Sequence, residues 1–262
     1  MKNIVLVPIL AAIILLNSFG TVGIRDNKVK KIVIDAGHGG HDPGTHGVYS
    51  KEKVLALAIA KKAGKYIEEN IKGVEVIYTR FDDSFIELEE RAQIANRNGA
   101  DLFISIHCNA LPQNPKIYGT ETYVMGLHKS EQNLQVAKRE NSVIFLEENY
   151  EETYGDFDPN SPDSHILFSL YQTAYLQNSL NLATKIENQF ETRAGRKSRG
   201  VKQAGFWVLW RTSMPSVLVE TGYLTNPSEE IELNDLLKQD YIASGIYRAV
   251  RDYKIEMDNM DK

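Results

Sequence analysis

The chain of 262 residues contains very little cysteine and no excess of positive charge. Cys108 is the only cysteine, which excludes a disulfide within one chain and a zinc site built on cysteine thiolates. The net charge of −5 argues against nucleic acid as a partner, because phosphate binding usually requires a basic face. With 42% apolar and 25% charged residues, the composition is that of a globular protein with a real core.

Residues 1–20 have the layout of a secretory signal peptide. Lys2 gives a positive start, an apolar stretch covers 4–16, and small or polar residues follow. This stretch is shorter than the roughly 20 residues that span a bilayer. We therefore expect a signal peptide over 1–20, a linker over 21–30, and a periplasmic or secreted protein without stable membrane insertion. A retained membrane anchor is the alternative.

The next segments alternate between strand and helix patterns. β-Branched and apolar runs predict strands at 31–35, 74–79 and 101–106. Helices are expected between them, at about 51–69 after a Ser50 cap, and from a Ser84/Glu87 capping box to about residue 98. This alternation predicts one α/β domain over 31–255, a mostly parallel twisted sheet with helices on both faces.

The regular alternation is interrupted over 127–177. A strand is expected at 118–124, followed by a charged helix at 131–149, an acidic run at 147–158 and a second amphipathic helix at 165–176. A segment of this length between strand and helix indicates a helical insertion. The pattern then resumes, with a helix at 178–193, a loop at 193–202, strands at 205–210 and 216–219, and a helix at 228–253.

Polar side chains follow three of the expected strands. His38, His107 and Glu220 each come after a strand, and the carboxyl ends of parallel strands meet at one edge of a sheet. Glu52 lies in the first turn of the helix that follows a glycine-rich loop, and that loop must return over the same edge. We therefore expect all four side chains to converge.

Two histidines and a carboxylate are the ligand set of a catalytic zinc site that keeps one position open for water. Zinc lowers the pKa of a bound water from about 15.7 to about 7, which provides a nucleophile at neutral pH. Glu220 could take the proton of that water and pass it to a leaving amine. This division of roles fits the hydrolysis of an amide.

Each of these residues has a simpler interpretation. Glu52 could favour the helix dipole, and His107 could be a core histidine with its hydrogen bonds satisfied. Glu220 is harder to explain structurally, because an unpaired buried carboxylate is costly. Cys108 is expected to be a small core residue, and the other histidines are expected at the surface: His41, His46, His128 and His165.

Five segments, taken in order, resemble the zinc-dependent N-acetylmuramoyl-L-alanine amidases of the AmiA/AmiB/AmiC type (Amidase_3). The resemblance covers about residues 31–253. The segments are Ile32-Val-Ile-Asp-Ala-Gly-His38-Gly-Gly, Glu52-Lys53, Arg91-x-x-x-Ala95-Asn96, Asp101 to Ala110 and Met214 to Asn226.

The resemblance implies that His38, Glu52 and His107 bind Zn²⁺ and that Glu220 is the catalytic glutamate. It implies a peptidoglycan substrate, cut between N-acetylmuramic acid and the first L-alanine of the stem peptide. Tyr223 stands where the family more often has phenylalanine. A muropeptide-binding protein without activity, or another zinc hydrolase such as a carboxypeptidase, are the alternatives; the intact Glu220 argues against the first.

The insertion over 127–177 also matches this resemblance. Similar amidases of cell division, which act in daughter-cell separation, carry an inserted helix that blocks the zinc site until an activator, often LytM-like, displaces it. A carboxylate of the insertion can occupy the open zinc position, and the candidates are Glu147, Glu148 and Asp163. Spacing does not choose among them, and a solvated charged segment without a regulatory role is the alternative.

Overall fold

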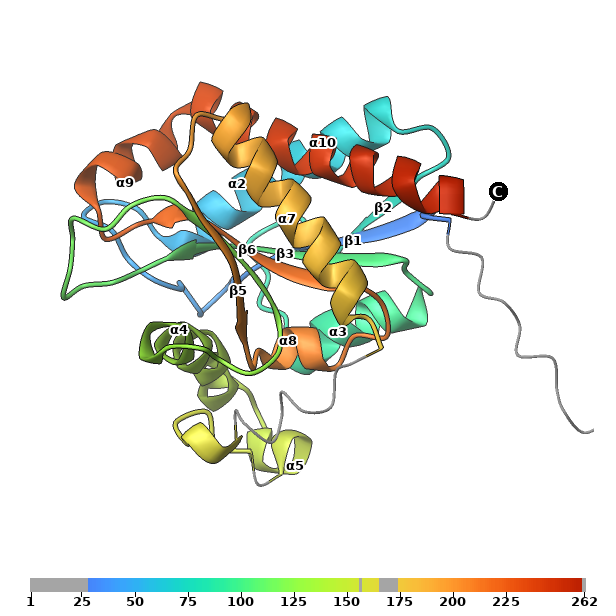
Figure 1. Cartoon of the computed structure of the whole chain (residues 1–262). Helices are drawn as coiled ribbons and strands as arrows, with labels where there is room; N and C mark the ends of the chain where they lie inside the picture. Colours follow the sequence, from blue (N-terminus) through green and yellow to red (C-terminus); the bar gives the residue numbers. More distant parts are fainter. Residues whose placement is uncertain (1–27, 156, 165–173, 261–262) are drawn as a thin grey trace, which may run out of the picture.

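The computed structural model describes residues 28–155, 157–164 and 174–260 (Figure 1). The expected signal peptide, most of the linker and most of the expected helix at 165–176, including His165, lie outside these residues. Among the residues that are described, no helix is long and apolar enough to cross a membrane.

One six-stranded sheet forms the centre of the domain. All neighbouring strands are parallel except β4 and β6, which are antiparallel, and the order is β2-β1-β3-β6-β4-β5. This confirms the predicted single α/β domain with a mostly parallel sheet. The strands are β1 (Lys31–Ala36), β2 (Glu75–Tyr78), β3 (Leu102–Asn109), β4 (Thr120–Met125), β5 (Ser198–Ala204) and β6 (Ser216–Tyr223).

Helices cover both faces of the sheet (Figure 1). On one face lie α2 (Glu52–Asn70), α7 (Leu176–Thr192) and α10 (Leu236–Met260), with α9 (Pro227–Asn234) leading into α10. On the other face lie α3 (Leu88–Arg97) and α8 (Trp207–Trp210), beside the described insertion elements α4 (Glu131–Asn141), η1 (Ser142–Leu146) and α5 (Tyr150–Tyr154).

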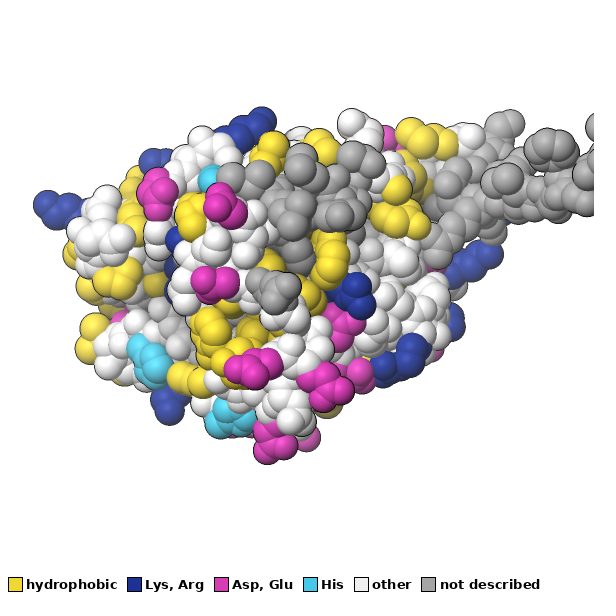
Figure 2. All heavy atoms as spheres, turned by 90° about the horizontal axis from the view of Figure 1, so that it is seen from below, with side chains coloured by type: hydrophobic (Ala, Val, Ile, Leu, Met, Phe, Trp, Pro, Cys, Tyr) yellow, Lys and Arg dark blue, Asp and Glu magenta, His cyan; other side chains and the backbone are white. Residues whose placement is uncertain are grey.

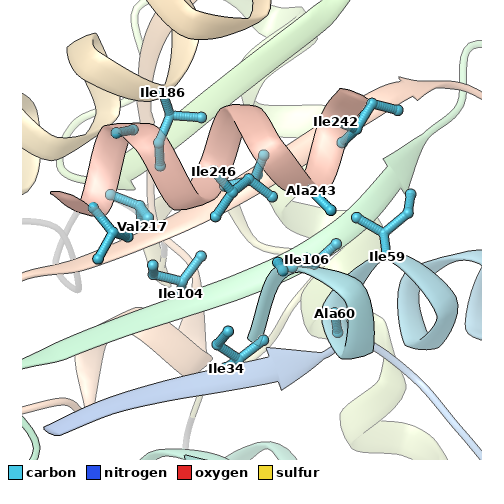
Figure 3. Close-up of a cluster of buried hydrophobic side chains, with 14 of the residues drawn as sticks. Ile34, Ile59, Ala60, Ile104, Ile106, Ile186, Val217, Ile242, Ala243 and Ile246 are labelled. Carbon is cyan, nitrogen blue, oxygen red and sulfur yellow. The ribbon is translucent and has the colours of Figure 1, made fainter. Parts of the chain in front are cut away.

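The core follows from the strand periodicity, because alternate residues of a strand face opposite sides of the sheet. Ile34, Ile104 and Val217, from three neighbouring strands, pack toward Ile59 of α2 and Ile246 of α10 (Figure 3). Each fully buried side chain of this size contributes about 1.5–3 kcal/mol to folding. The same strands leave their polar residues, including His107 and Glu220, on the other face at their carboxyl ends.

Two elements near the end of the chain differ from the prediction. Residues 205–210, expected as a strand, contain the short helix α8, because periodicity does not distinguish a short apolar strand from a short buried helix. The expected loop at 193–202 contains most of β5, whose residues are mostly half-buried. An edge strand with a half-exposed surface need not be apolar, which is why its composition resembled a loop.

Four expected features of the helices were also wrong. Ser50 does not cap α2, which begins after Lys51, and its hydroxyl instead accepts a hydrogen bond from Asn234. The expected Ser84/Glu87 capping box does not form, since α3 begins only at Leu88 and Ser84 bonds Asp82. The expected helix at 131–149 divides into α4 and η1, and the expected helix at 228–253 divides into α9 and α10.

Candidate metal centre

Four separate segments bring His38, Glu52 and His107 together beside Glu220. In the sheet, His107 of β3 and Glu220 of β6 are direct register partners. His38 follows β1, and Glu52 is the first residue of α2. The Oε1 atom of Glu52 lies 3.1 Å from Nε2 of His38 and 3.0 Å from Nδ1 of His107.

A fourth ligand-type side chain, Glu140, joins this cluster. Its Oε2 atom lies 3.3 Å from Nε2 of His38 and 3.0 Å from Nδ1 of His107. One ligand atom from each of His38, Glu52, His107 and Glu140 lies within 4.8 Å of the others, and all four residues are buried. The arrangement can hold one metal ion.

Glu140 was missed in the sequence because it follows Lys138 and Arg139 and resembled part of a solvated, charged helix. Its position relative to Val136 and Ala137 is the signal that could have identified it. Residues three and four apart share one face of a helix, and both of these apolar residues are buried. Glu140 therefore lies on the side of α4 that faces the domain.

The three carboxylates that were expected near the metal lie elsewhere. Glu147 is buried, but its oxygens accept hydrogen bonds from the backbone N–H of Leu88 and the hydroxyl of Tyr154. Glu148 and Asp163 are exposed. None of these three residues belongs to the cluster around His38 and His107.

Neighbouring groups fix the orientation of the ligands. Nδ1 of His38 donates a hydrogen bond of 2.7 Å to Asp42, which leaves Nε2 facing the cluster. Glu52 accepts hydrogen bonds from the backbone N–H of Thr45 at 2.8 Å and of Cys108 at 2.8 Å. Cys108 is buried, as expected of a core residue.

Two glycines of the loop after β1 are required by close packing. A Cβ atom on Gly37 would lie 2.3 Å from the ring of His107. A Cβ atom on Gly44, whose φ is +65°, would lie 2.6 Å from the ring of His38. The glycine-rich sequence thus lets the loop pass directly against both histidine ligands.

A comparison with known proteins identifies the family. The family model described as N-acetylmuramoyl-L-alanine amidase matches residues 32–252. The chain belongs to this family. The chain is 36% identical over 233 residues to the N-acetylmuramoyl-L-alanine amidase AmiA of Escherichia coli, covering 87% of this chain and 77% of that protein.

Solved structures of similar proteins have the same fold. An N-acetylmuramoyl-L-alanine amidase from Clostridium difficile 630 is 29% identical, with a TM-score of 0.65 and coverage of 86% of this chain and 97% of that one. The CwlD amidase of Clostridioides difficile, solved in complex with the GerS lipoprotein, is 28% identical, with a TM-score of 0.62 and coverage of 86% and 98%. The family predicted from the motifs is thereby confirmed, and the chain is an N-acetylmuramoyl-L-alanine amidase.

In the cluster of this amidase, the pKa values of the two histidines are raised and that of Glu52 is lowered. Burial disfavours charge on His38, but the nearby Glu52, Asp42 and Glu140 outweigh it and raise its pKa well above the usual range. The pKa of His107 is raised to about 9, because Glu140 and Glu52 outweigh the effect of burial. Conversely, burial of Glu52 is outweighed by His38, which lowers the pKa of Glu52 to about 2.

The donor set fits a metal ion. Among the described residues, Nε2 of His38 and Oε2 of Glu140 are buried and have no hydrogen-bond partner, although buried polar atoms are nearly always paired. Two imidazole nitrogens and carboxylate oxygens are ligands that zinc prefers. A shared cation at this position would satisfy both unpaired atoms.

Glu220 has a pKa that is shifted in the opposite direction to that of Glu52. It is fully buried, and burial together with the charge of Glu140 raises its pKa well above the usual range. Arg139 lies against it, with Nη2 at 3.4 Å from Oε1 of Glu220, 2.9 Å from Glu140 and 3.2 Å from Oδ1 of Asn109. The C-terminal turn of α4 therefore contacts both the cluster and Glu220.

A groove of about 390 Å³ leads to the cluster. Its lining includes Asp42 and His46 of the loop after β1 and four residues of the insertion, which are Arg139, Ser142, Val143 and Leu146. His41 and His46 are exposed and His128 is half-buried, and none of them belongs to the cluster. The insertion therefore forms part of the lining of the groove beside the cluster.

Proposed function

We propose that this amidase is a zinc hydrolase that cleaves peptidoglycan between N-acetylmuramic acid and the L-alanine of the stem peptide. The observation that carries the proposal is the buried His38, Glu52 and His107 cluster beside Glu220. These three residues would hold Zn²⁺. Zinc bound there would polarise the amide carbonyl and lower the pKa of a water molecule.

Glu220 would perform the proton transfers. Burial and the charge of Glu140 raise the pKa of Glu220, which favours uptake of a proton, and a carboxyl group that takes up a proton can pass it on. It would take a proton from the attacking water and deliver it to the leaving amine of L-alanine. Its fixed position beside His107 in neighbouring strands keeps this transfer close to the metal ligands.

Mass spectrometry of digested sacculi tests the bond that is cut. The full chain supplied with zinc should release whole stem peptides that begin with L-alanine, whereas a carboxypeptidase would shorten the stems on the glycan. Glu220→Gln should release none and bind zinc as the wild type does. If neither the wild type nor a Glu140→Gln variant releases stem peptides with zinc present, the proposed activity is wrong.

We further propose that the insertion inhibits the amidase through Glu140 and Arg139. Glu140 would take the metal position that water needs, and Arg139 would pair with Glu220 and oppose its action as a base. The support is the contact of both side chains with the two parts of the site. This proposal replaces Glu147, Glu148 and Asp163 as the blocking carboxylates.

Basal activity tests this inhibition. Glu140→Gln removes the charge that competes with water and should raise stem-peptide release by about tenfold or more, since a charge-assisted contact contributes about 1.5–3 kcal/mol. Glu131→Gln, at the exposed start of the same helix, is the matched control and should not change the rate. Equal rates for all three proteins would contradict inhibition by Glu140.

We also propose that the protein is exported to the periplasm or outside the cell, acts in daughter-cell separation and is released by an activator of the LytM-like kind. The segment 1–20 supports export, and the partner-bound CwlD–GerS structure is a precedent for a protein partner. The face formed by α4, η1 and α5 supports a partner with basic groups. It shows acidic side chains around apolar ones (Figure 2), and the sequence has no lysine or arginine between Arg139 and Lys185.

Imaging and protein chemistry test this part. A fluorescent fusion should collect at the division site, and the mature N-terminus should lie near residues 18–24. A purified activator should raise the wild-type rate but leave Glu140→Gln nearly unchanged. A uniform distribution of the fusion would contradict the role in separation, and an uncleaved N-terminus would contradict release by signal cleavage.

A further inference from the structure

The backbone of His38 is unusual for a non-glycine residue. Its φ angle is +61°, and Asn149 is the only other non-glycine residue with a positive φ in the described part of the chain. A histidine in this left-handed region is strained, and it stays there only if its surroundings hold it. Neighbouring groups must therefore hold the turn that presents this candidate metal ligand.

Arg91 of α3 is one such group. Its side chain is only 2% exposed, and its guanidinium donates to the carbonyl of Ala36 at 2.8 Å and to the carbonyl of His38 at 2.8 Å. The same group also donates to Asp35 at 2.8 Å and, through Nε, to the carbonyl of Ile86 at 2.9 Å. The buried side chain of Arg91 therefore forms hydrogen bonds to the backbone on both sides of Gly37.

Arg80 completes this contact from a different segment. Its Nε donates to the carbonyl of Ala36 at 2.8 Å, and its Nη2 donates to the carbonyls of Gly37 at 2.7 Å and Lys53 at 2.8 Å. Three successive carbonyls, from Ala36 to His38, thus accept hydrogen bonds from arginines. Arg80 also ties this turn to the first turn of α2, which carries Glu52.

We propose that Arg91, assisted by Arg80, is a positioning residue that holds His38 in its left-handed conformation so that Nε2 faces the metal. This inference rests on the proposed zinc site. A guanidinium presents several donors in a rigid plane, whereas a lysine presents a single flexible ammonium that cannot bridge two carbonyls and a carboxylate in the same way. Arg91 acts through the backbone carbonyl of His38.

A purely structural role for Arg91 would be to neutralise the buried Asp35. Asp35, however, also accepts hydrogen bonds from the hydroxyls of Thr79 at 2.7 Å and Ser105 at 2.6 Å. An asparagine at position 35 removes the charge and keeps one oxygen that can accept from Thr79 and Arg91, while its amide N–H can donate to the hydroxyl of Ser105. The two roles can therefore be separated by comparing Asp35→Asn with Asp35→Asn/Arg91→Met, because only the double variant loses the bond to His38.

The test is the binding of Zn²⁺ alone to the metal-free full chain, measured by competition with a chromophoric chelator. Asp35→Asn should bind zinc nearly as tightly as the wild type. Asp35→Asn/Arg91→Met and Arg91→Lys should bind it about 10–100-fold more weakly, the usual effect of losing a group that orients a ligand. Arg97→Met, on the exposed face of α3, is the control and should not change the affinity.

The visible absorption of bound Co²⁺ provides a second readout, because it reports the arrangement of ligands and not the stability of the fold. The bands should change in Arg91→Lys and stay unchanged in Arg97→Met. Wild-type zinc affinity and an unchanged cobalt spectrum in whichever Arg91 variant folds would overturn the inference. Absence of zinc binding by the wild type would instead contradict the proposed function itself.

Discussion

At the scale of single residues, Glu230 shows how one buried carboxylate can order a whole loop. Its two oxygens accept hydrogen bonds from three successive backbone N–H groups, those of Val48, Tyr49 and Ser50, at 2.8–2.9 Å. A Cβ atom on Gly47 would lie 2.2 Å from this carboxylate, so the loop closes tightly around it. The loop leads directly into Glu52, and its order therefore supports the metal centre.

Replacing this carboxylate should destabilise the protein in a pH-dependent way. Burial of Glu230 is outweighed by the three N–H groups, which lower its pKa. A lowered pKa in the folded state gives stability that is present above about pH 4.3 and is lost as the pH falls through the folded pKa. Glu230→Gln should thus reduce the free energy of unfolding by about 2 kcal/mol at pH 7, since hydrogen bonds to charged groups contribute about 1.5–3 kcal/mol.

Urea unfolding of the wild type and Glu230→Gln at pH 7 and at pH 3.5 measures this effect. The difference in free energy between the two proteins should shrink at the lower pH. The exposed Glu75 is the matched control, and Glu75→Gln should behave as the wild type at both pH values. A constant difference between pH 7 and pH 3.5 would show that the charge of Glu230 is not responsible.

The residues at the centre differ in how far the sequence could identify them. His38, His107 and Glu220 could be predicted because each follows or ends a strand, and parallel strands bring their ends together. Glu140 could not, because its place depends on how the insertion docks across the sheet, which no local pattern records. Arg91 stood out only as part of a motif, since its role depends on three-dimensional contacts with the turn after β1.

At the scale of elements, the end of α4 shows how a tertiary contact overrides local helix propensity. Residues 131–149 have a continuous helical pattern, and Ser130 caps the start by accepting a hydrogen bond from Asn133. The helix nevertheless ends at Asn141, whose side chain donates to the carbonyl of Gly205 and accepts from the N–H of Trp207, both at 2.8 Å. This docking fixes the neighbouring Arg139 and Glu140 over the site.

Asn141→Ala should therefore loosen the end of α4 and raise basal activity. The change removes two hydrogen bonds to the buried backbone of Gly205 and Trp207, which costs about 0.5–1.5 kcal/mol for each bond. Stem-peptide release should rise, because the end of α4 no longer holds Glu140 over the metal position, and the midpoint of urea unfolding should fall. The two assays should be run on the same preparation.

Asn181→Ala is the control for this experiment. Asn181 also donates a hydrogen bond of 2.8 Å, to Glu256, but on the opposite face of the sheet, away from α4. It should affect stability slightly and leave the basal rate unchanged. A lower stability of Asn141→Ala without any increase in basal rate would contradict the idea that docking of α4 restrains the amidase.

At the scale of the whole molecule, the metal centre joins parts of the chain that are distant in sequence. His107 comes from the sheet, His38 from the loop after β1, Glu52 from a helix on one face, and Glu140 from the insertion on the other face. The class of fold could be predicted because each element has its own periodicity. The meeting of all four side chains at one site could not be predicted, because it depends on the relative placement of elements on the two faces of the sheet.

Because zinc would link these elements only in the folded state, it should stabilise the whole protein and not just the cleft. At a free concentration 100 times the Kd, a ligand specific for the folded state adds about 2.7 kcal/mol to the free energy of unfolding. For a domain of this size, that corresponds to a rise in Tm of roughly 5–10 °C. Thermal unfolding of the chelator-treated full chain, with and without added zinc, measures this shift.

Glu140→Gln makes the experiment specific to the insertion. Without this carboxylate, zinc keeps three ligands from the domain but loses its ligand from α4, so the rise in Tm should be smaller than in the wild type. Glu131→Gln retains Glu140 as a ligand and should show the full rise in Tm. The same Glu140→Gln protein should have the higher basal activity, so weaker stabilisation by zinc and greater activity should occur together. An equal rise in Tm for all three proteins would mean that the insertion does not bind the metal.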